Sequence, residues 1–575
     1  MNPKSKEFTN LEIAELLRDV AASYQLQGEK NNRFKIIAYE RAADAIEHAS
    51  SELKDLWDEG KLKDVPGVGE SIAGHLDELF KTGHVKHFEE LMKDYPKMMF
   101  RLLKIQGIGP KTALKIVSEG NIPKEVKEEL KEVESKTTRH LLPYAWERAS
   151  EVIDWLKKIK EVKQVDPLGS LRRKASTIGD IDIAVATDNP NMVIDHFVKF
   201  PKAQKILEKG EKTASISLPG DVQVDLMVQP QESYGSLLQH FTGSKHHNIA
   251  LREYSLKKGL SLSEYGIRKV GEKDKKIKEF SNEEDFYKYL DLEWIPPELR
   301  EDAGEVEASK EDKLPKLVEP SDIKADLQIH SDFDIETSHD LGISSMEEII
   351  KEGNDLNYEY LAFTEHNPSK SKHNEKEILD LLKKKREKID EINYSLVNSV
   401  KSRVKKVFNS LEIDILPDGS CPIPLNGFDY LDFALVSIHS SFNLSKDQMT
   451  KRVVNSLSWH PKALIFAHPT ARKLNEREGV ELDWPKIFDF CIRNNKWIEI
   501  NADPMRLDLP DFLVREALKA GVKLTLGTDS HDSQMMKNMV YGVSIARRGW
   551  CTKYDIVNSL DLRDFEKLLK EVINK

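Results

Sequence analysis

The spacing of hydrophobic positions changes along the chain and divides it into three stretches. Up to about residue 165, apolar side chains recur every three to four positions, as in FTNLEIAELLRDVAASYQ at 8–25, where Thr9 is a candidate N-cap. This spacing predicts amphipathic helices. From about 165 to 230, β-type runs such as DIDIAVAT and VQVDLMV alternate with helical segments, which predicts an α+β domain.

The third stretch follows a polar, acidic, proline-bearing segment at 300–321, which is typical of an inter-domain linker. Beyond it, short apolar strands alternate with helices, which predicts a β/α barrel or a layered sheet. Several strands carry His, Asp or Glu at or just past their ends, as in YLAFTEHN, FALVSIHS, ALIFAHP and KLTLGTDSHD. Sites on such folds lie at the carboxyl ends of the strands.

Composition narrows the class of protein. The 575 residues are 39% hydrophobic and 32% charged, which predicts several globular domains. No apolar run reaches the roughly 18 residues of a membrane span, and the N-terminal residues lack the apolar core of a signal peptide. Three widely spaced cysteines, Cys421, Cys491 and Cys551, favour a reducing cytoplasm.

The charge is distributed unevenly. The net charge of −11 argues against a non-specific coat for nucleic acid. Residues 101–175, however, hold 17 Lys and Arg against 11 Asp and Glu. A contact with a polyanion is expected there, although a solvated helix face shows the same pattern.

Two Gly-x-Gly pairs interrupt the helical stretch: Gly67 and Gly69 in VPGVGESIAGHL, and Gly107 and Gly109 in IQGIGPKTALKI. Glycine permits a tight turn with a close backbone approach, and amides at the start of the next helix can bind a phosphate oxygen. A single pair would fit an ordinary turn between helices. Two pairs beside a basic region resemble the helix-hairpin-helix motif, which implies binding of the DNA backbone without sequence preference.

Asp180 and Asp182 alternate in a β-type run, so their side chains face the same side of the strand. Adjacent carboxylates repel one another unless a cation lies between them. Asp225, in the run VQVDLMV, supplies a third carboxylate. Three carboxylates on neighbouring strands can bind two Mg²⁺ ions, which activate a hydroxyl nucleophile and neutralise a leaving pyrophosphate.

Gly169 and Ser170, followed after nine residues by Asp-Ile-Asp-Ile, resemble the signature of the nucleotidyltransferase superfamily. With YGSLLQHFTGSK at 234–245 and GLSLSEYGI at 259–267, they make the first 300 residues or so resemble a family X DNA polymerase. The resemblance implies a small helical domain that binds the 5′-phosphate of a gap, a second hairpin subdomain, a nucleotidyltransferase palm, a subdomain for the nascent base pair, a linker and a C-terminal domain. Their expected ranges are 1–90, 91–140, 141–232, 233–300, 301–321 and 322–575.

The same resemblance implies roles for single residues. Asp180, Asp182 and Asp225 would bind the Mg²⁺ or Mn²⁺ pair, with Asp225 beside the primer 3′-hydroxyl. Lys35 and the hairpin glycines would hold DNA phosphates. The residues that would contact the incoming nucleotide or the base pair are Gly169, Ser170, Arg173, Gly179, Phe241, Gly243, Asn248 and Arg252.

Some positions depart from the family pattern. His240 stands where many members have Tyr, and Gln223 and Met227 stand where the animal β enzyme has arginines. In animal members, a lysine forms a Schiff base that removes deoxyribose phosphate, whereas Ser71 and His75 occupy the corresponding helix here. Because a Schiff base needs an amine, we expect this lyase activity to be weak or absent.

The third stretch holds a mixed set of possible metal ligands, which suits Mn²⁺ or Zn²⁺. The set comprises His330, Asp334, His366, Glu412, His439, His468, Asp529 and His531. Their order resembles the PHP phosphoesterase domain of bacterial and archaeal family X polymerases. This implies a distorted (β/α)7 barrel with 3′→5′ exonuclease activity and, in some members, cleavage at abasic sites or of 3′-blocking groups.

Three positions depart from the general PHP pattern. Gln328 replaces the first His of His-x-His, and Glu365 replaces the Asp of Thr-Asp-His. The usual Ser-Asp-Gly is interrupted in SDFDIETSHDLG, so that Asp334 or Asp340 would supply the carboxylate. One metal position is therefore expected to be weak, while Glu365 is expected to lie outside the ligand set.

Together these patterns predict a cytoplasmic, nucleoid-associated DNA polymerase of family X, monomeric and without a membrane partner. It would act on gapped or nicked duplex DNA and dNTPs in base excision repair. Three alternatives stay open: a PHP phosphoesterase whose polymerase half delivers DNA, a non-catalytic repair scaffold, and a template-independent transferase. The intact aspartates argue against the first, the cost of burying unused ligands against the second, and the double hairpin against the third.

Overall fold

The computed structural model describes residues 8, 10–47, 53–58, 60–65, 67–103, 105, 108–118, 122–123, 126–127, 130, 139–271 and 276–574. Contacts group the chain into two compact units. The first comprises Met1–Leu171, Thr177–Thr242 and Ser255–Phe286, and the second comprises Arg172–Ser176, Gly243–Tyr254 and Tyr287–Lys575. Among the helices of the described ranges, none is both long and apolar enough to cross a lipid bilayer.

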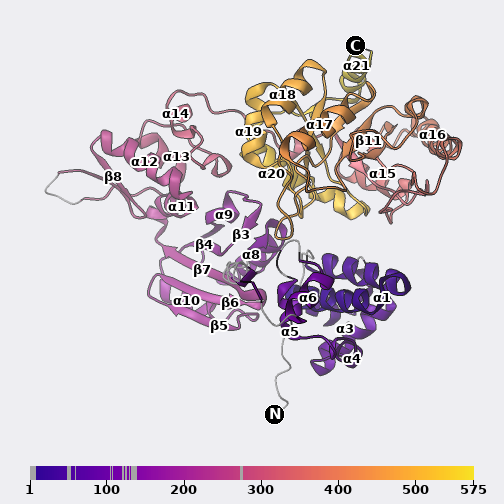
Figure 1. The fold of residues 1–575 in the computed structure, drawn as a ribbon. Helices are drawn as coiled ribbons and strands as arrows, with labels where there is room; N and C mark the ends of the chain where they lie inside the picture. Colours follow the sequence, from indigo (N-terminus) through magenta and orange to yellow (C-terminus); the bar gives the residue numbers. More distant parts are fainter. Residues whose placement is uncertain are drawn as a thin grey trace. The chain divides into compact units, whose positions relative to one another are not determined.

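The N-terminal part is helical, as its apolar spacing predicts (Figure 1). Its longest helix changes direction at Gly28, where φ is +143°. Ile13, Leu17, Leu76 and Phe88 belong to one buried cluster that joins the first helices. The elements are α1 (Asn10–Glu47), α2 (Leu53–Asp58), η1 (Leu62–Asp64), α3 (Glu70–Thr82), α4 (Lys86–Met92), α5 (Lys97–Leu102) and α6 (Pro110–Ser118).

Both glycine pairs precede a helix. Gly69 is the N-cap of α3, and the carbonyl of Gly109 accepts the amide of Ala113 in α6 at 2.9 Å. Gly67 has a φ of +78°, and a Cβ atom there would lie 3.2 Å from the backbone of Arg41. This turn therefore needs glycine. Gly107 lies outside the described residues.

A five-stranded mixed sheet follows, with the strand order β2-β4-β7-β6-β5. Strands β4 and β7 run parallel, whereas the other neighbouring pairs are antiparallel. Helices α8 (Leu142–Leu156) and α10 (Pro190–Phe197) contact this sheet (Figure 1). The strands are β2 (Gln164–Pro167), β4 (Ile181–Ala186), β5 (Lys205–Lys209), β6 (Thr213–Leu218) and β7 (Val222–Gln229), and β1 (His140–Leu141) pairs with β3 (Thr177–Ile178).

The segment after the sheet is mainly helical, with one two-stranded ribbon. Its elements are α11 (Tyr234–Thr242), α12 (Lys245–Lys257), β8 (Leu260–Ser263), β9 (Gly266–Lys269), α13 (Glu283–Tyr289) and η4 (Pro297–Leu299). The range expected to be a linker, 301–321, contains helix α14 (Glu305–Lys310) and the fully buried Val318. Glu305 is also buried, and its carboxylate is hydrogen-bonded to His247, which in turn is hydrogen-bonded to Tyr287. Charge and proline content describe a segment by itself, so they do not reveal such contacts with residues far away in the chain.

The C-terminal region, residues 322–574, shows the expected alternation of parallel strands and helices. Its strands form two sheets, β10-β11-β12 and β13-β14-β15-β16-β17. Parallel bridges join Ile329 to Ser530 and His366 to Glu412. Strands in this arrangement place their carboxyl ends on the same side.

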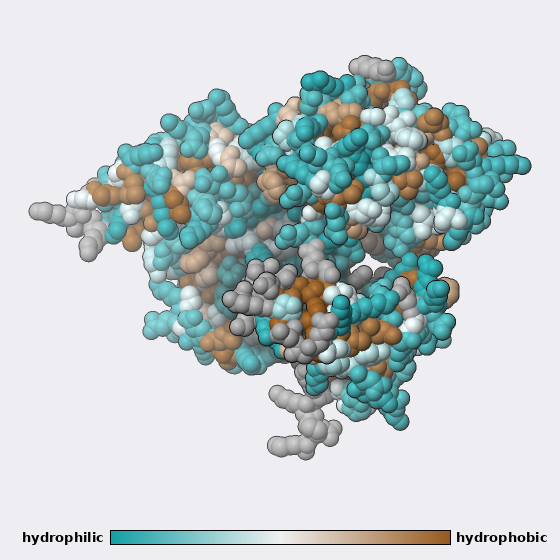
Figure 2. Space-filling view, in the orientation of Figure 1, coloured by the Kyte–Doolittle hydropathy of each residue, from teal (hydrophilic) through white to brown (hydrophobic). Residues whose placement is uncertain are grey.

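The strands of the C-terminal region are β10 (Ala325–Ile329), β11 (Tyr360–Phe363), β12 (Lys406–Asn409), β13 (Glu412–Asp414), β14 (Ala434–Ser437), β15 (Ala463–Phe466), β16 (Trp497–Asn501) and β17 (Lys523–Gly527). Its longer helices are α15 (Met346–Asp355), α16 (Glu375–Val397), α17 (Lys446–Leu457), α18 (Trp484–Arg493), α19 (Asp511–Ala520), α20 (Met539–Arg548) and α21 (Leu562–Ile573). The buried core of this region is rich in Ile, Leu, Val and Phe. On the face drawn in Figure 2, hydrophilic residues cover most of the surface, and the exposed apolar residues form separate small areas.

Candidate active sites

Three aspartates meet at the centre of the five-stranded sheet. Asp182 on β4 and Asp225 on β7 are register partners in the parallel pair, and Asp180 directly precedes β4. One carboxylate oxygen from each residue lies within 4.8 Å of the others. Because side chains on one face of neighbouring strands lie next to each other, the strand pairing itself creates the cluster. Carboxylate oxygens are the ligands that Mg²⁺ and Mn²⁺ prefer, so the donor set fits such ions.

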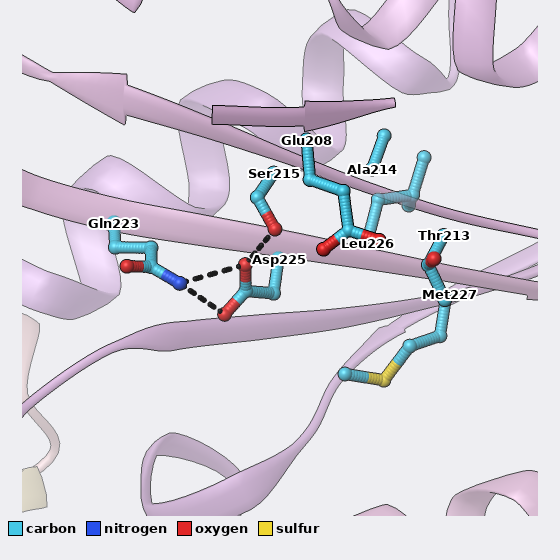
Figure 3. Close-up of a pocket in the computed structure, with 8 residues that line it drawn as sticks. All are labelled: Glu208, Thr213, Ala214, Ser215, Gln223, Asp225, Leu226 and Met227. Carbon is cyan, nitrogen blue, oxygen red and sulfur yellow. Dashed lines mark hydrogen bonds between the residues drawn. The ribbon is translucent and has the colours of Figure 1, made fainter. Parts of the chain in front are cut away.

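Asp225 is held in place by two neighbours (Figure 3). The Gln223 amide donates to both carboxylate oxygens at 3.0 Å, and the Ser215 hydroxyl also donates to one of them. These residues, with Glu208 and Met227, line a pocket next to Asp225. Gln223, one of the departures from the animal β enzyme, therefore fixes the third carboxylate.

Gly169 explains the Gly-Ser pair upstream of the aspartates. Its φ is +56°, and a Cβ atom on this residue would lie 2.3 Å from Oδ2 of Asp182. The amide of Leu168 donates to the carbonyl of Asp182 at 2.7 Å. The chain at the start of α9 (Gly169–Arg172) therefore lies directly against the carboxylate, which a residue with a side chain would not allow.

In the second unit, Arg173 and Gly243 lie together. A Cβ atom on Gly243 would be 3.2 Å from a terminal nitrogen of Arg173. Nε of Arg173 donates to Glu301 at 2.9 Å, and the same Glu301 oxygen accepts from Arg548 of α20 at 2.9 Å. Arg548 also donates to the carbonyl of Arg173 at 2.8 Å. The guanidinium of Arg173 is thus oriented by a carboxylate shared with a residue of the C-terminal region.

The other expected nucleotide and DNA contacts lie on several elements. Gly179 packs against Arg139, with 3.2 Å between a Cβ atom built on it and that guanidinium. Phe241 packs on a buried cluster that includes Tyr234. The remaining residues are Ser170 in α9, Asn248 and Arg252 in α12, and Lys35, which is exposed on α1 with Nζ 4.8 Å from the centre of the Tyr24 ring.

In the C-terminal region, residues at successive strand ends converge on one cluster. Because these strands are parallel, residues that follow them reach the same edge of the sheets. Seven expected ligands fall into overlapping groups whose ligand atoms lie within 4.8 Å of one another: His330, His366, Glu412, His439, His468, Asp529 and His531.

Two further members of the cluster were not expected, and one expected member lies outside it. His339 and Asp414 join His366 and His439 in one of the groups. Asp334 belongs to no such group of the described residues. Its carboxylate accepts the amide of Glu336 at 2.6 Å within its own loop. The role of Asp334 as a metal ligand stays a prediction. Asp414 lies two residues after Glu412 on β13, and residues two apart on a strand face the same side. This spacing could have identified Asp414 as a member of the cluster from the sequence.

Glu412 is the centre of the cluster. Its carboxylate lies 2.7 Å from Nε2 of His468 and 3.2 Å from both His330 and His439. Burial raises the pKa of Glu412, but the surrounding histidines outweigh it and hold that pKa well below its usual range.

Burial lowers the pKa of His439 to about 4. It also lowers the pKa of His531 to about 4, with a further contribution from His330. Neutral imidazole is the form that binds metal.

Several ring nitrogens in the cluster are buried without a bonding partner. Nδ1 of His366, Nδ1 of His468 and Nε2 of His531 are buried without a hydrogen-bond partner among the described residues. A buried polar atom without a partner is costly, whereas a bound cation would satisfy it. The mixed His and carboxylate set therefore fits Mn²⁺ or Zn²⁺.

Gln328 and Glu365 show how the departures from the PHP pattern are accommodated. The Gln328 amide donates to Glu412 at 2.8 Å and to Asp529 at 3.3 Å. Glu365 lies outside the ligand groups, accepts the amide of Ser331 at 3.2 Å and pairs with the buried Lys385.

Comparison with known proteins gives a consistent result. Residues 8–85 match a helix-hairpin-helix domain, 100–140 a SAM-like helix-hairpin-helix tandem, and 237–301 the thumb of DNA polymerase beta. The chain is 30% identical over 587 residues to the DNA polymerase/3′-5′ exonuclease PolX of Bacillus subtilis (strain 168), covering 97% of this chain and 99% of that protein. It is 25% identical over 298 residues to DNA polymerase lambda of Rattus norvegicus, covering 46% of this chain and 50% of that one.

The chain therefore belongs to the family X DNA polymerases, as its motifs predict. Its full-length similarity is to the bacterial PolX type, whereas the match to the animal enzyme covers about half of each chain. The helix-hairpin-helix prediction is confirmed for both N-terminal segments.

Proposed function

We propose that this protein is a DNA-directed DNA polymerase that fills short gaps during base excision repair, with a separate 3′→5′ exonuclease site in its C-terminal region. The observation that carries the polymerase assignment is the register of Asp182 against Asp225, with Asp180 beside them. The full-length similarity to a protein named as polymerase and 3′-5′ exonuclease supports both activities.

In the polymerase site, Asp180, Asp182 and Asp225 would hold two Mg²⁺ or Mn²⁺ ions. Bound ions of this kind would supply Lewis-acid chemistry at the primer 3′-hydroxyl and at the leaving pyrophosphate. Asp225 lies next to the primer end, and Gln223 keeps its carboxylate aligned. The family resemblance assigns contacts with the triphosphate to Gly169, Ser170, Gly179 and Arg173, and Glu301 orients the Arg173 guanidinium.

The family resemblance also assigns the other substrate contacts. Phe241 and Gly243 face the sugar of the incoming dNTP, and Asn248 and Arg252 contact the base pair. The hairpin glycines and Lys35 hold the phosphates of a gapped or nicked duplex. We propose a monomer that works in the cytoplasm, associated with the nucleoid during repair.

The lyase reaction of animal relatives is absent or weak in this proposal. Helix α3 carries Ser71 and His75 in place of an amine. His75 stacks on His87, with ring centroids 5.0 Å apart. Burial, with a smaller contribution from His87, lowers the pKa of His75. A neutral imidazole cannot form a Schiff base.

The C-terminal region is proposed to be a PHP domain with a distorted (β/α)7 barrel. The proposed ligands of Mn²⁺ or Zn²⁺ are His330, Asp334, His366, Glu412, His439, His468, Asp529 and His531. The bound ions would supply an activated water for attack on phosphorus. The same site could also act at abasic sites or on 3′-blocking groups. The buried ring nitrogens without partners support this use of the cluster.

The test uses a 5′-labelled primer on a duplex with a one-nucleotide gap and a downstream 5′-phosphate, incubated with Mn²⁺ and dNTPs. Extension by one nucleotide that disappears in Asp182→Ala supports the polymerase site. Shortening of the primer by Asp182→Ala that disappears when His468→Ala is added supports the nuclease. A wild-type protein that shortens but never extends the primer would favour a phosphoesterase with a DNA-delivering half.

A further inference from the structure

A buried pair of a histidine and a glutamate lies in the segment that follows the five-stranded sheet. Nδ1 of His247 on α12 lies 2.6 Å from a carboxylate oxygen of Glu305 on α14, and Nε2 of the same ring lies 3.0 Å from the hydroxyl of Tyr287. The side chains of His247 and Glu305 are 0% and 1% exposed. Neither belongs to the metal-ligand groups found among the described residues. The two proposed active sites therefore leave this pair without a role.

The carboxylate of Glu305 is held in its charged form. One of its oxygens accepts the amide of Asp302 at 3.0 Å, and the other accepts the amide of Ala303 at 2.7 Å. Burial raises the pKa of Glu305, but His247 and the backbone amides outweigh it and lower that pKa. A charged group at such a depth needs its partner, because loss of one member of a buried pair leaves the other uncompensated.

Other contacts join α12 to residues 290–305 at its two ends. Just before the helix, the amide of Ser244 donates to the carbonyl of Arg300 at 3.0 Å. Further along, the hydroxyl of Tyr254 donates to the carbonyl of Leu290 at 3.1 Å. The buried pair lies between these contacts and joins two side chains. It therefore fixes the rotation of the helix about its axis, which two contacts at the ends leave less defined.

The side of α12 next to the pair carries the residues expected to contact the base pair. Asn248 directly follows His247 and is partly exposed, and Arg252 is exposed. Residues four apart lie on the same side of a helix, so Asn248 and Arg252 share one side. His247 and the fully buried Leu251 share the neighbouring side. A rotation of α12 would therefore move both expected base-pair contacts together.

The segment that holds α12 also holds the arginine expected to contact the triphosphate. Glu301, four residues before Glu305, accepts Nε of Arg173 at 2.9 Å. Residues 300–305 thus contact α12 through Glu305 and the Arg173 guanidinium through Glu301. Two sets of expected nucleotide contacts share one support.

We propose that His247 and Glu305 are positioning residues for nucleotide selection, which fix the orientation of α12 and thereby set where Asn248 and Arg252 meet the nascent base pair. The inference rests on the proposed polymerase function and adds two residues that no motif assigned. Apolar residues of similar size often stabilise a protein as well as a buried ion pair does. The pair differs from them in its directional hydrogen bonds, which allow a single geometry.

The competing explanation is that the pair only keeps this segment folded. Its loss would then lower the amount of active protein and slow the insertion of every nucleotide equally. A positioning role predicts a loss that falls on the correct nucleotide, because contacts in fixed places favour one base-pair geometry.

The experiment measures single-turnover insertion of the correct and of each incorrect dNTP on a duplex with a one-nucleotide gap, with the full-length protein and Mg²⁺. The variants are His247→Phe, which keeps a ring without hydrogen bonds, and His247→Asn, whose amide can still donate to Glu305. His246→Phe is the matched control, because His246 is the exposed neighbour on the same helix. Urea unfolding, exonuclease activity and burst amplitude report the folding and the active fraction of each variant.

We expect His247→Phe to raise the apparent Kd of the correct dNTP about 10-fold, which corresponds to the loss of one hydrogen bond to a charged group. The apparent Kd of the incorrect dNTPs should stay nearly unchanged, so discrimination should fall about 10-fold. His247→Asn should recover most of the discrimination, and His246→Phe should match the wild type.

Wild-type discrimination in folded His247→Phe would overturn the proposal, as would equal losses for correct and incorrect nucleotides. If His247→Phe does not fold, the double variant with Glu305→Gln, which leaves no buried charge, replaces it with the same expectations. A wild-type protein that extends no primer would instead refute the polymerase function, so the two failures are distinguishable.

Discussion

Replacing Gly169 by alanine tests whether the Gly-Ser turn exists to admit the Asp182 carboxylate. The added Cβ atom would lie 2.3 Å from Oδ2 of Asp182, about 1.1 Å closer than the 3.4 Å at which ordinary van der Waals contact begins. The carboxylate must therefore shift by roughly 1 Å or rotate away. A misplacement of about 1 Å in a catalytic group can cost about 100-fold in rate. Alanine at a φ of +56° also costs about 1 kcal/mol of stability.

Gly259 offers a matched control for the backbone cost. Its φ is +72°, and no described atom lies within 4 Å of a Cβ atom built there. Gly259→Ala should therefore lose about the same 1 kcal/mol without touching the aspartates. Single-turnover extension of a gapped primer gives the rate, and urea unfolding of the same samples gives the stability.

We expect the rate of Gly169→Ala to fall about 100-fold, while Gly259→Ala stays close to the wild type. Exonuclease activity should be unchanged in both variants, because the C-terminal cluster contains neither residue. Equal and small losses of polymerase rate in the two variants would refute the reasoning, because backbone strain alone would then account for both.

Three further perturbations follow from contacts described above. Lys385→Met leaves Glu365 buried without its ion pair and should lower the free energy of unfolding of the C-terminal region in urea by about 3–5 kcal/mol. The double variant with Glu365→Gln should recover most of that loss, whereas an unchanged unfolding midpoint in Lys385→Met would contradict the prediction. Arg548→Met removes one of the two arginines bound to Glu301, so the KM for dNTP should rise about 10-fold, which corresponds to the loss of one charge-assisted hydrogen bond. The control Arg493→Met breaks an exposed ion pair and should leave the KM unchanged. Dialysis against a chelator should lower the thermal unfolding midpoint, because a ligand at 100 times its Kd contributes about 2.7 kcal/mol to the free energy of unfolding. Addition of Zn²⁺ should restore the midpoint of the wild type. An apoprotein as stable as the metal-loaded protein would argue against bound ions in the cluster.

The residues on strands could be predicted from the sequence because a strand has a period of two. Asp180 and Asp182 alternate, and Asp225 lies in the next long β-type run, so their convergence needs only the pairing of two strands. The histidines at the ends of the C-terminal strands converge for a similar reason, since parallel strands share one edge.

The loop residues could not be predicted in the same way. Asp334 and His339 lie in one irregular segment between β10 and α15, where no period relates spacing to direction. The first accepts the Glu336 amide within its own turn, and Ser338 joins the second to Asp414. The folded character of 301–321 was missed because Glu305 is buried by contacts with residues far away in the chain. Gly169 was recognised from its motif, but its clash with Asp182 is visible only in three dimensions.

Arg173 and Arg548 share the carboxylate of Glu301, so removal of the C-terminal region would also change the polymerase half. A gene shortened within 301–321 would still encode the aspartates and the hairpins, yet its product would lack Arg548, which binds both Glu301 and the backbone of Arg173. Arg547, which pairs with Glu298, would be lost at the same cut. Activity measured on an isolated polymerase half would therefore understate that of the whole protein, because Arg173 would have lost a contact that holds it in place.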